Sequence, residues 1–270
     1  MSDLLSYIIS DLTFQLPFTE SFLQNALLNG LIYFILAGLF YSLLWSPFQL
    51  KPNSRIQLKV TSTFTKRVIE LLHSLSAVFI FALVDILLIK AGKAGYTKVY
   101  FEHTTLLSFL TSVTLMILLH DTYFYWSHRL LHNPRFYWIH KIHHKSTDPS
   151  PFAAFAFHPI ETLIEAFFYV LFVVFIPVHV DGIITWQVLQ QVDNCILHSG
   201  YEIYPSSFLE NFVFRFKTSS THHNLHHKRN KGNYGLYFTW WDKWGGTWIE
   251  ETDEVFSEVS GRGDNIKKNK

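Results

Sequence analysis

The chain has 270 residues, of which 49% are hydrophobic and only 16% charged, and its net charge is +1. An average soluble domain carries roughly 25% charged residues, so this composition favours a membrane protein. The near-zero charge and the lack of a basic stripe argue against nucleic acid as a partner. The first 20 residues carry three acids and no lysine or arginine, which argues against a cleavable signal peptide.

Four apolar regions are predicted to enter the membrane, where a spanning helix needs about 20 mostly apolar residues. In chain order they are Phe22–Trp45, residues 71–89, residues 104–120, and a split region made of Ala166–Val180 and Ile183–Val192. Asp181 and Gly182 interrupt the fourth region, and neither half is long enough to span comfortably. We interpret the two halves as a bent pair that enters the membrane and returns.

The distribution of charge predicts the orientation of these helices. Residues 51–67 carry five bases and no acid, whereas the first 20 residues carry three acids and no base. The positive-inside rule therefore places the N-terminus outside and residues 51–67 in the cytoplasm. Counting crossings then brings residues 126–150 and 198–270 to the cytoplasmic side as well.

We expect residues 1–250 to form a single integral membrane domain, since no internal repeat or phosphate-binding loop divides it. Residues 251–270 are polar and are expected to form a disordered tail.

Histidine is the unusual residue type, with 15 copies, whereas Cys195 is the single cysteine. One cysteine cannot build a thiolate metal site alone, so any metal must be held by nitrogen or oxygen. The histidines form three boxes with the spacings HxxxH, HxxHH and HxxHH, and one further histidine comes directly before the third box. The boxes are His128 with His132, His140 with His143 and His144, and His223 with His226 and His227, preceded by His222.

Residues three and four apart share one face of a helix, so each box can present two or three imidazoles toward one point. Imidazole suits iron, zinc, copper and nickel. The three boxes together supply more nitrogen donors than one tetrahedral zinc ion can use, which predicts two metal ions.

Isolated histidines have a simpler explanation. His73, His103 and His179 are expected to be packed or interfacial side chains, whereas His120 and His158 could belong either to the site or to the packing. Asp121 and Asp242 are candidate carboxylates that accept a hydrogen bond from the ring nitrogen of a ligand histidine that does not bind the metal. For Asp242, a role as an interfacial acid or a turn cap is an equal alternative.

The boxes and their surroundings resemble the fatty acid hydroxylase and sterol desaturase superfamily. Further matching segments are His120–Arg129, Phe136–Lys141, Phe155–Pro159, His198–Gly200, Asn233–Gly235, Trp241-Asp242 and Gly246-Thr247. The resemblance covers about residues 100–250, the expected catalytic part. The segment Phe155–Pro159 is most similar to the sterol C5-desaturase (lathosterol oxidase-like) branch. Fatty acid 2-hydroxylases carry a histidine where this chain has Asn194.

The resemblance implies an all-α fold, a polytopic membrane helical bundle with a cytoplasmic helical cap that holds two iron ions. The implied ligands are His128, His132, His140, His143, His144, His198, His223, His226 and His227. His120, His158, His222, Asp121, Asn194 and Asp242 remain candidates for a ligand or a supporting role. O2 would be the co-substrate, and a separate cytochrome b5- or ferredoxin-like donor would supply electrons.

The expected function is therefore an O2-dependent oxidoreductase that desaturates or hydroxylates a lipid, with sterol C5 desaturation as the first hypothesis. Hydroxylation of a fatty acyl, carotenoid or ether lipid stays open. A metal transporter is disfavoured because the boxes lie outside the apolar stretches, and a zinc hydrolase because the sequence has no HExxH motif. The expected location is the endoplasmic reticulum membrane in a eukaryote or the inner membrane in a bacterium.

Overall fold

The computed structural model describes residues 16–47, 50–59, 63–212 and 214–268, and for 264–268 the backbone alone. Its α-helices are α3 (Phe18–Trp45), α4 (Phe64–Lys93), α5 (Leu106–Leu131), α6 (Tyr137–His140), α7 (Pro159–Phe175), α8 (Val180–Leu197), α9 (Ser220–Arg229), α10 (Trp240–Trp244) and α11 (Thr252–Lys268). Two-residue strands β1 (Val99–Tyr100) and β2 (Val178–His179) form a parallel pair, in which Val99 lies opposite Val178. Short 3₁₀ turns lie at Pro52–Ser54, His143–Lys145, Pro151–Ala153 and Ser206–Phe208.

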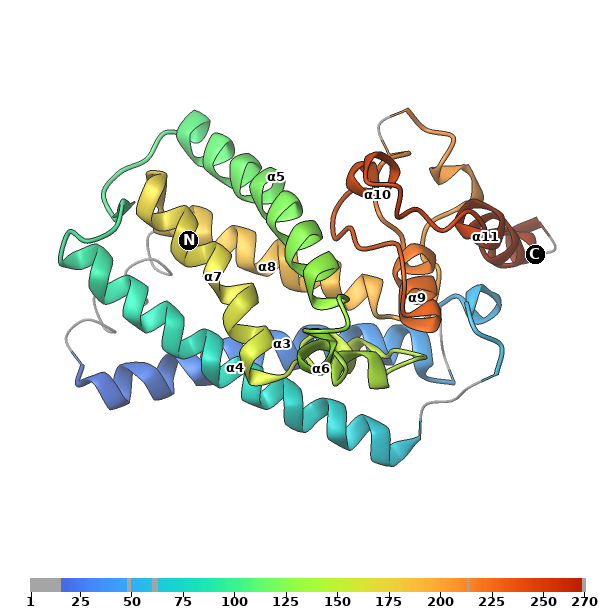
Figure 1. The fold of residues 1–270 in the computed structure, drawn as a ribbon, viewed down its shortest axis with the longest axis horizontal. Coiled ribbons are helices and arrows are strands. Elements are labelled where there is room, and N and C mark those ends of the chain that lie inside the picture. Colours follow the sequence, from blue (N-terminus) through green and yellow to red (C-terminus); the bar gives the residue numbers. More distant parts are fainter. Residues whose placement is uncertain (1–15, 48–49, 60–62, 213, 269–270) are drawn as a thin grey trace.

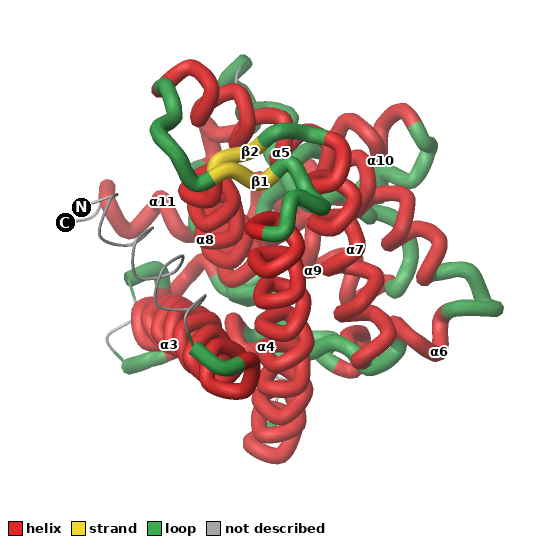
Figure 2. Tube along the Cα trace, turned by 90° about the vertical axis from the view of Figure 1, so that its left-hand side faces the viewer, coloured by secondary structure: helices red, strands yellow, loops and turns green. Residues whose placement is uncertain are grey.

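The molecule consists of a helical bundle with a smaller cluster of helices at one end (Figure 1). Helices α3, α4, α5, α7 and α8 form the bundle, while α9, α10 and α11 lie together beyond it (Figure 1). The strands β1 and β2 lie side by side, where they join the end of α4 to the turn between α7 and α8 (Figure 2). This arrangement confirms the predicted all-α fold.

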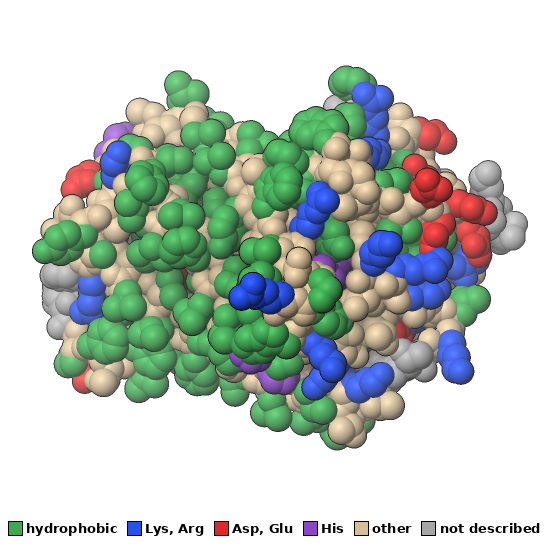
Figure 3. All heavy atoms as spheres, in the orientation of Figure 1, with side chains coloured by type: hydrophobic (Ala, Val, Ile, Leu, Met, Phe, Trp, Pro, Cys, Tyr) green, Lys and Arg blue, Asp and Glu red, His purple; other side chains and the backbone are tan. Residues whose placement is uncertain are grey.

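Three helices, α3, α4 and α5, are long and apolar enough to cross a membrane. Their outer faces expose large apolar side chains, and on α3 these recur every four residues at Leu23, Leu27, Leu31, Ile35 and Leu39. Hydrophobic side chains cover much of the bundle surface, whereas charged side chains gather near α9 and α11 (Figure 3). Such a division suits a bundle immersed in lipid and a smaller end exposed to water.

Side-chain caps set where several of these helices begin. The hydroxyls of Thr63, Thr105 and Ser219 accept hydrogen bonds from the backbone N–H three residues on, at the start of α4, α5 and α9. Such bonds satisfy one of the donors that a helix start leaves free. At the other end of α9, Asn230 adopts the left-handed conformation with φ of 57° and terminates the helix.

The structure corrects the position of the break in the fourth apolar region. Helix α7 ends at Phe175 and α8 begins at Val180, so the chain turns at residues 176–179 and not at Asp181-Gly182. Pro177 lies in this turn, and a proline cannot continue a helix because it lacks the N–H. Asp181 instead lies in the first turn of α8, where the positive end of the helix dipole stabilises an acid.

The prediction of a disordered tail was wrong over the described residues, because α11 occupies Thr252–Lys268. Phe256 and Val259 lie on one face of α11 and are almost fully buried, with 1% exposure each. The same helix approaches the start of the basic loop, where Arg262 donates a hydrogen bond to the carbonyl of Arg55. The tail therefore folds because two apolar residues at helical spacing pack against α9 and the 3₁₀ turn at Pro52–Ser54.

The segment between the second histidine box and α7 threads into the bundle. Phe155 stacks on Tyr33 of α3, with ring centroids 4.6 Å apart. The Tyr33 hydroxyl donates to the carbonyl of Phe152 at 2.9 Å. Ser74 of α4 donates to the same carbonyl at 3.0 Å, so the segment is held against α3 and α4, and the position of the second box relative to the bundle is fixed.

Candidate metal centre

The structure brings together all nine histidines of the expected ligand set. The first box lies at the end of α5, the second spans α6 and the following 3₁₀ turn, His198 terminates α8, and the third box lies on α9. The nine side chains form two groups, each with one ligand nitrogen per residue and all of those nitrogens within 4.8 Å of one another. The five-histidine group is His128, His132, His140, His144 and His226, and the four-histidine group is His143, His198, His223 and His227.

The second box does not lie on one helix face, as its spacing had suggested. Helix α6 ends at His140, and a 3₁₀ turn begins at His143. The change of backbone sends His140 and His144 into the five-histidine group and His143 into the four-histidine group. The third box is divided in the same way, because His226 points to one group and its neighbours His223 and His227 to the other.

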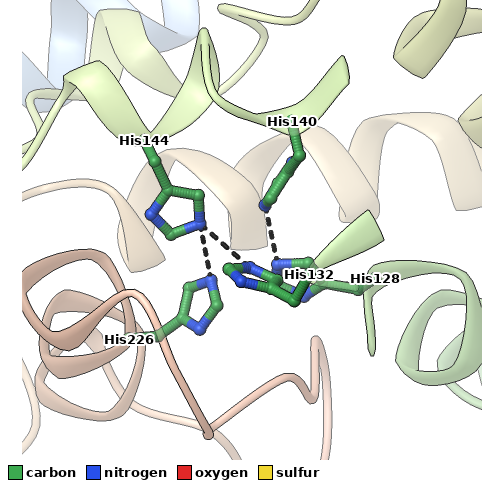
Figure 4. Close-up of side chains that lie close together, drawn as sticks. All are labelled: His128, His132, His140, His144 and His226. Carbon is green, nitrogen blue, oxygen red and sulfur yellow. Dashed lines mark hydrogen bonds between the residues drawn. The ribbon is translucent and has the colours of Figure 1, made fainter. Parts of the chain in front are cut away.

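Within the five-histidine group, the Nε2 atoms point at one another (Figure 4). His128 Nε2 lies 3.1 Å from His140 Nε2, and His144 Nε2 lies 3.0 Å from His226 Nε2. Yet His128 and His226 each donate their Nδ1 proton to a backbone carbonyl, of Tyr234 and Gly232 respectively. A neutral imidazole has one N–H, so the Nε2 atoms of His128 and His226 present lone pairs to the centre of the group.

The four-histidine group repeats this arrangement around His198. Its Nδ1 donates to the carbonyl of Asn194 at 2.9 Å. Its Nε2 therefore presents a lone pair to three other Nε2 atoms, those of His143 at 3.1 Å, His223 at 3.0 Å and His227 at 3.2 Å. In both groups nitrogen lone pairs converge on one point, an arrangement that a cation stabilises.

Protonation does not supply that cation. Burial lowers the pKa of His144 to about 3 and that of His198 to about 4. Burial and the neighbouring imidazoles also hold the pKa values of His143, His223 and His227 well below the usual value. The rings are therefore neutral near pH 7, which is the form that binds a metal ion.

The spacing of the nearest nitrogens fits a metal ion with more than four ligands. Two nitrogens bound at about 2.1 Å to one ion lie about 3.0 Å apart at right angles and about 3.4 Å apart in a tetrahedron. The closest Nε2 pairs in both groups lie at 3.0–3.2 Å, and all ligand nitrogens of a group lie within 4.8 Å of one another. The donor set and its spacing thus fit two ions, one in each group.

Sequence reasoning missed the carboxylate that contacts a ligand directly. Glu161, in the first turn of α7, accepts a hydrogen bond from His140 Nδ1 at 2.5 Å, and both side chains are buried. Such a partner fixes the tautomer and direction of a ligand imidazole. Its position three residues after His158 and shortly before the predicted apolar region Ala166–Val180 was the available signal, but nothing in the sequence pairs it with His140.

Neither candidate carboxylate accepts a hydrogen bond from any of the nine histidines in the described part of the chain. Asp121 accepts from the backbone N–H groups of Tyr237 and Phe238 and from the indole of Trp240. Asp242 accepts from the N–H groups of Tyr234 and Gly235, and lies 3.2 Å from His222 Nε2. Both aspartates organise the loop after α9, and Asp242 holds the residue whose carbonyl orients His128.

The remaining candidate side chains lie outside both groups. His120 is bonded to the hydroxyl of Tyr237, His158 caps α7 through its Nδ1, and His222 is bonded to Asp242. Asn194 contributes its backbone carbonyl to His198, while its side chain donates to the carbonyl of Ala154. These residues surround the centre, whereas the two groups are complete without them.

Comparisons with known proteins agree with this geometry. The fatty acid hydroxylase family matches residues 113–247, which is half of the chain. Among curated proteins, a Delta(7)-sterol 5(6)-desaturase of Gibberella zeae is 36% identical over 50% of this chain and 41% of its own length. Lathosterol oxidase of Homo sapiens is 29% identical over 57% of this chain and 51% of its own. Methylsterol monooxygenase 1 of Rattus norvegicus is 38% identical over 49% and 44%.

The chain thus spans about half the length of the curated relatives that it matches. No solved structure matches it. The matched region contains all three histidine boxes, His198 and the loop that Asp242 holds. The chain belongs to the fatty acid hydroxylase family.

Proposed function

We propose that this protein is a membrane-bound, O2-dependent di-iron oxidoreductase that oxidises a lipid, with a sterol as the first candidate. The observation that carries the proposal is the convergence of nine neutral imidazoles into two adjacent groups, with the outer nitrogens of His128, His140, His198 and His226 held by acceptors. When bound, a pair of iron ions supplies the activation of O2 that oxidation of an unactivated C–H bond requires.

Five ligands in one group and four in the other would leave a six-coordinate ion with one or two open positions. Structural zinc sites are closed by four ligands, so a larger set with open positions favours catalysis over a structural role. The chain's own contribution is to hold the imidazoles neutral and aimed, and to exclude water from a buried centre. His143, His198, His223 and His227 are each at most 3% exposed.

The relatives support a sterol as the substrate. Two of them are named for sterol desaturation or lathosterol oxidation, and one for methylsterol monooxygenation. Desaturation is the first candidate reaction, and hydroxylation is the second because of the monooxygenase. Three helices able to cross a membrane would give such a lipid direct access to the bundle.

We propose further that the metal centre lies on the cytoplasmic side of the membrane, that of the endoplasmic reticulum in a eukaryote. The basic residues of the loop between α3 and α4 support this side, and Arg55 of that loop is paired with Asp148, four residues after the second box. Electrons would come from a separate cytochrome b5- or ferredoxin-like donor. Residues 1–15, whose acids form part of the orientation argument, lie outside the described residues.

The deciding experiment measures metal content in the purified, membrane-reconstituted chain and in a His143→Ala, His226→Ala double variant, which removes one nitrogen from each group. The expected result is close to two irons per chain in the wild type and loss of both in the variant. The wild type should then oxidise a Δ7-sterol in the presence of a reductant and O2. Equal metal content in wild type and variant would refute the centre, and metal-dependent transport in sealed vesicles would revive the transporter hypothesis.

A further inference from the structure

A cavity inside the bundle adjoins the histidine centre. It lies between α3, α4, α5, α7 and α8, and we refer to it as the bundle cavity. A smaller cavity, the centre cavity, is lined by histidines of both groups, including His128, His140 and His198. Phe124, Phe157, Glu165 and Asn194 line both cavities, so the two adjoin at these four residues.

Glu165 of α7 and Gln191 of α8 both line the bundle cavity. Glu165 is half-buried, lies at the junction of the two cavities and forms no hydrogen bond or ion pair within the described residues. Gln191 is only 6% exposed, and its Oε1 has no hydrogen-bond partner. Buried polar atoms are almost always hydrogen-bonded, so Gln191 Oε1 points to a ligand that supplies the missing partner.

The carboxylate at the far end of the bundle cavity is, in contrast, satisfied, because Asp85 accepts hydrogen bonds from Asn29 and Gln187 at its two oxygens. Gln187 lies seven residues before Asn194 on α8, about 10 Å further from the centre. Nearer to the histidines, Glu161 is bonded to His140 through Oε1, while its Oε2 has no partner within the described residues. Unpaired oxygens of Glu161 and Gln191 therefore lie on the side of the cavity that is nearer to the histidines.

We propose that Glu165 and Gln191 bind a hydroxyl group of the lipid substrate and thereby determine which carbon reaches the metal centre. A hydroxyl can donate its proton to Oε1 of Gln191 and accept one from the protonated carboxyl group of Glu165, so one small group satisfies both side chains. The remaining lining is largely aromatic and aliphatic, with Phe81, Phe124 and Phe155 among its members, and the volume of about 60 Å³ takes the hydroxyl-bearing end of a lipid but not its whole body.

The same chemistry disfavours a free fatty acid in this position, because its carboxylate has no proton to donate to Gln191 Oε1. Since Glu165 also lines the centre cavity, the oxidised carbon is expected a few bonds from the hydroxyl-bearing carbon and not at the far end of a long chain. This inference rests on the proposed function and narrows its substrate class to hydroxylated lipids.

The test compares the dissociation constants of a hydroxylated lipid and its deoxy analogue. The probes are radiolabelled lathosterol with cholest-7-ene, and octadecan-1-ol with octadecane, bound to the full chain in nanodiscs under argon so that no turnover occurs. The wild type is expected to bind at least one alcohol about tenfold more tightly than its deoxy analogue, the value of one good hydrogen bond. Glu165→Leu and Gln191→Leu should each reduce this ratio below about threefold.

Binding of the deoxy analogue reports whether each variant keeps an intact cavity, and it should change little. Asp85→Asn is the matched control, because it makes a comparable carboxyl change in the same cavity at a satisfied side chain, and it should keep the tenfold ratio. Either a wild-type ratio near one or a wild type that binds none of the probes would overturn the inference. It would also be overturned if the ratio survived in both leucine variants, or if the variants lost binding of the alcohol and of its deoxy analogue equally.

Iron content and O2-dependent oxidation, measured on the same samples, separate the two proposals. A two-iron protein that oxidises sterols without hydroxyl discrimination would keep the proposed function and refute this inference. Hydroxyl discrimination in a chain that retains no iron would keep the hydroxyl site and refute the proposed di-iron function.

Discussion

Replacing Glu161 by alanine should weaken metal binding in the five-histidine group more than any other single change outside the ligands. Glu161 is the one carboxylate hydrogen-bonded to any of the nine ligand histidines in the described part of the chain, through His140 Nδ1 at 2.5 Å. The side chains of the pair are 3% and 1% exposed, so water cannot replace the lost acceptor without a rearrangement. The freed imidazole could then turn or change tautomer.

The size of the effect follows from the loss of this single buried bond. Removing the outer partner of a ligand histidine typically lowers metal affinity by about 10- to 100-fold, which corresponds to about 1.4–2.7 kcal/mol. Glu161→Gln keeps an acceptor oxygen and should fall at the lower end of that range, whereas Glu161→Ala should fall at the upper end. The assay is competition for iron against a chelator of known affinity, with metal content followed at each chelator concentration.

Glu165→Gln is the matched control, since it makes the same change on the same helix one turn further on, at a side chain without a bond to a histidine in the described chain. Its metal affinity should equal that of the wild type. If Glu161→Ala retained iron as well as Glu165→Gln does, the role of the Glu161 bond in orienting His140 would be refuted.

Three further predictions concern the loop, the backbone and the orientation. Asp242→Ala should lower metal retention about tenfold and destabilise the fold by about 2 kcal/mol, because it leaves the N–H groups of Tyr234 and Gly235 without an acceptor. Chelator competition and thermal unfolding measure the two effects, and unchanged values would contradict the prediction. Gly235→Ala should lower the free energy of unfolding by about 1–3 kcal/mol, because the added Cβ would lie 2.4 Å from the carbonyl oxygen of Phe238. Gly38→Ala is the control, since its added Cβ would have no atom within 4 Å, and it should be neutral or stabilising. Cysteines introduced at Leu58 and Tyr96, which are 77% and 81% exposed, should react with a membrane-impermeant thiol reagent from opposite sides of sealed membrane vesicles of known orientation. Leu58→Cys should react from the cytoplasmic side and Tyr96→Cys from the other side, over the low background of the buried Cys195, and labelling of both from one side would refute the orientation.

Features that depend on local pattern could be predicted from the amino-acid sequence. Apolar runs of sufficient length predicted the three long helices, and α3 begins within four residues of the predicted start and ends at the predicted Trp45. The spacing within the boxes identified eight of the nine histidines that the structure places in the two groups, and the family resemblance supplied the ninth, His198. Such features need only the three- and four-residue periodicity of a helix and the length that a bilayer requires, both of which a single segment displays.

The division of the histidine boxes between the two groups, and the acceptors that orient the ligand imidazoles, depend on tertiary structure. His143 and His144 are neighbours in the chain, yet a 3₁₀ turn sends them to different groups. Glu161 meets His140 across 21 residues, and the carbonyls of Tyr234 and Gly232 become acceptors only once Asp242 and the end of α9 have shaped the loop. Helix α11, expected to be disordered, forms because Phe256 and Val259 find a surface made by distant segments. Each of these depends on contacts between segments far apart in the chain, and those contacts exist only after the bundle has packed.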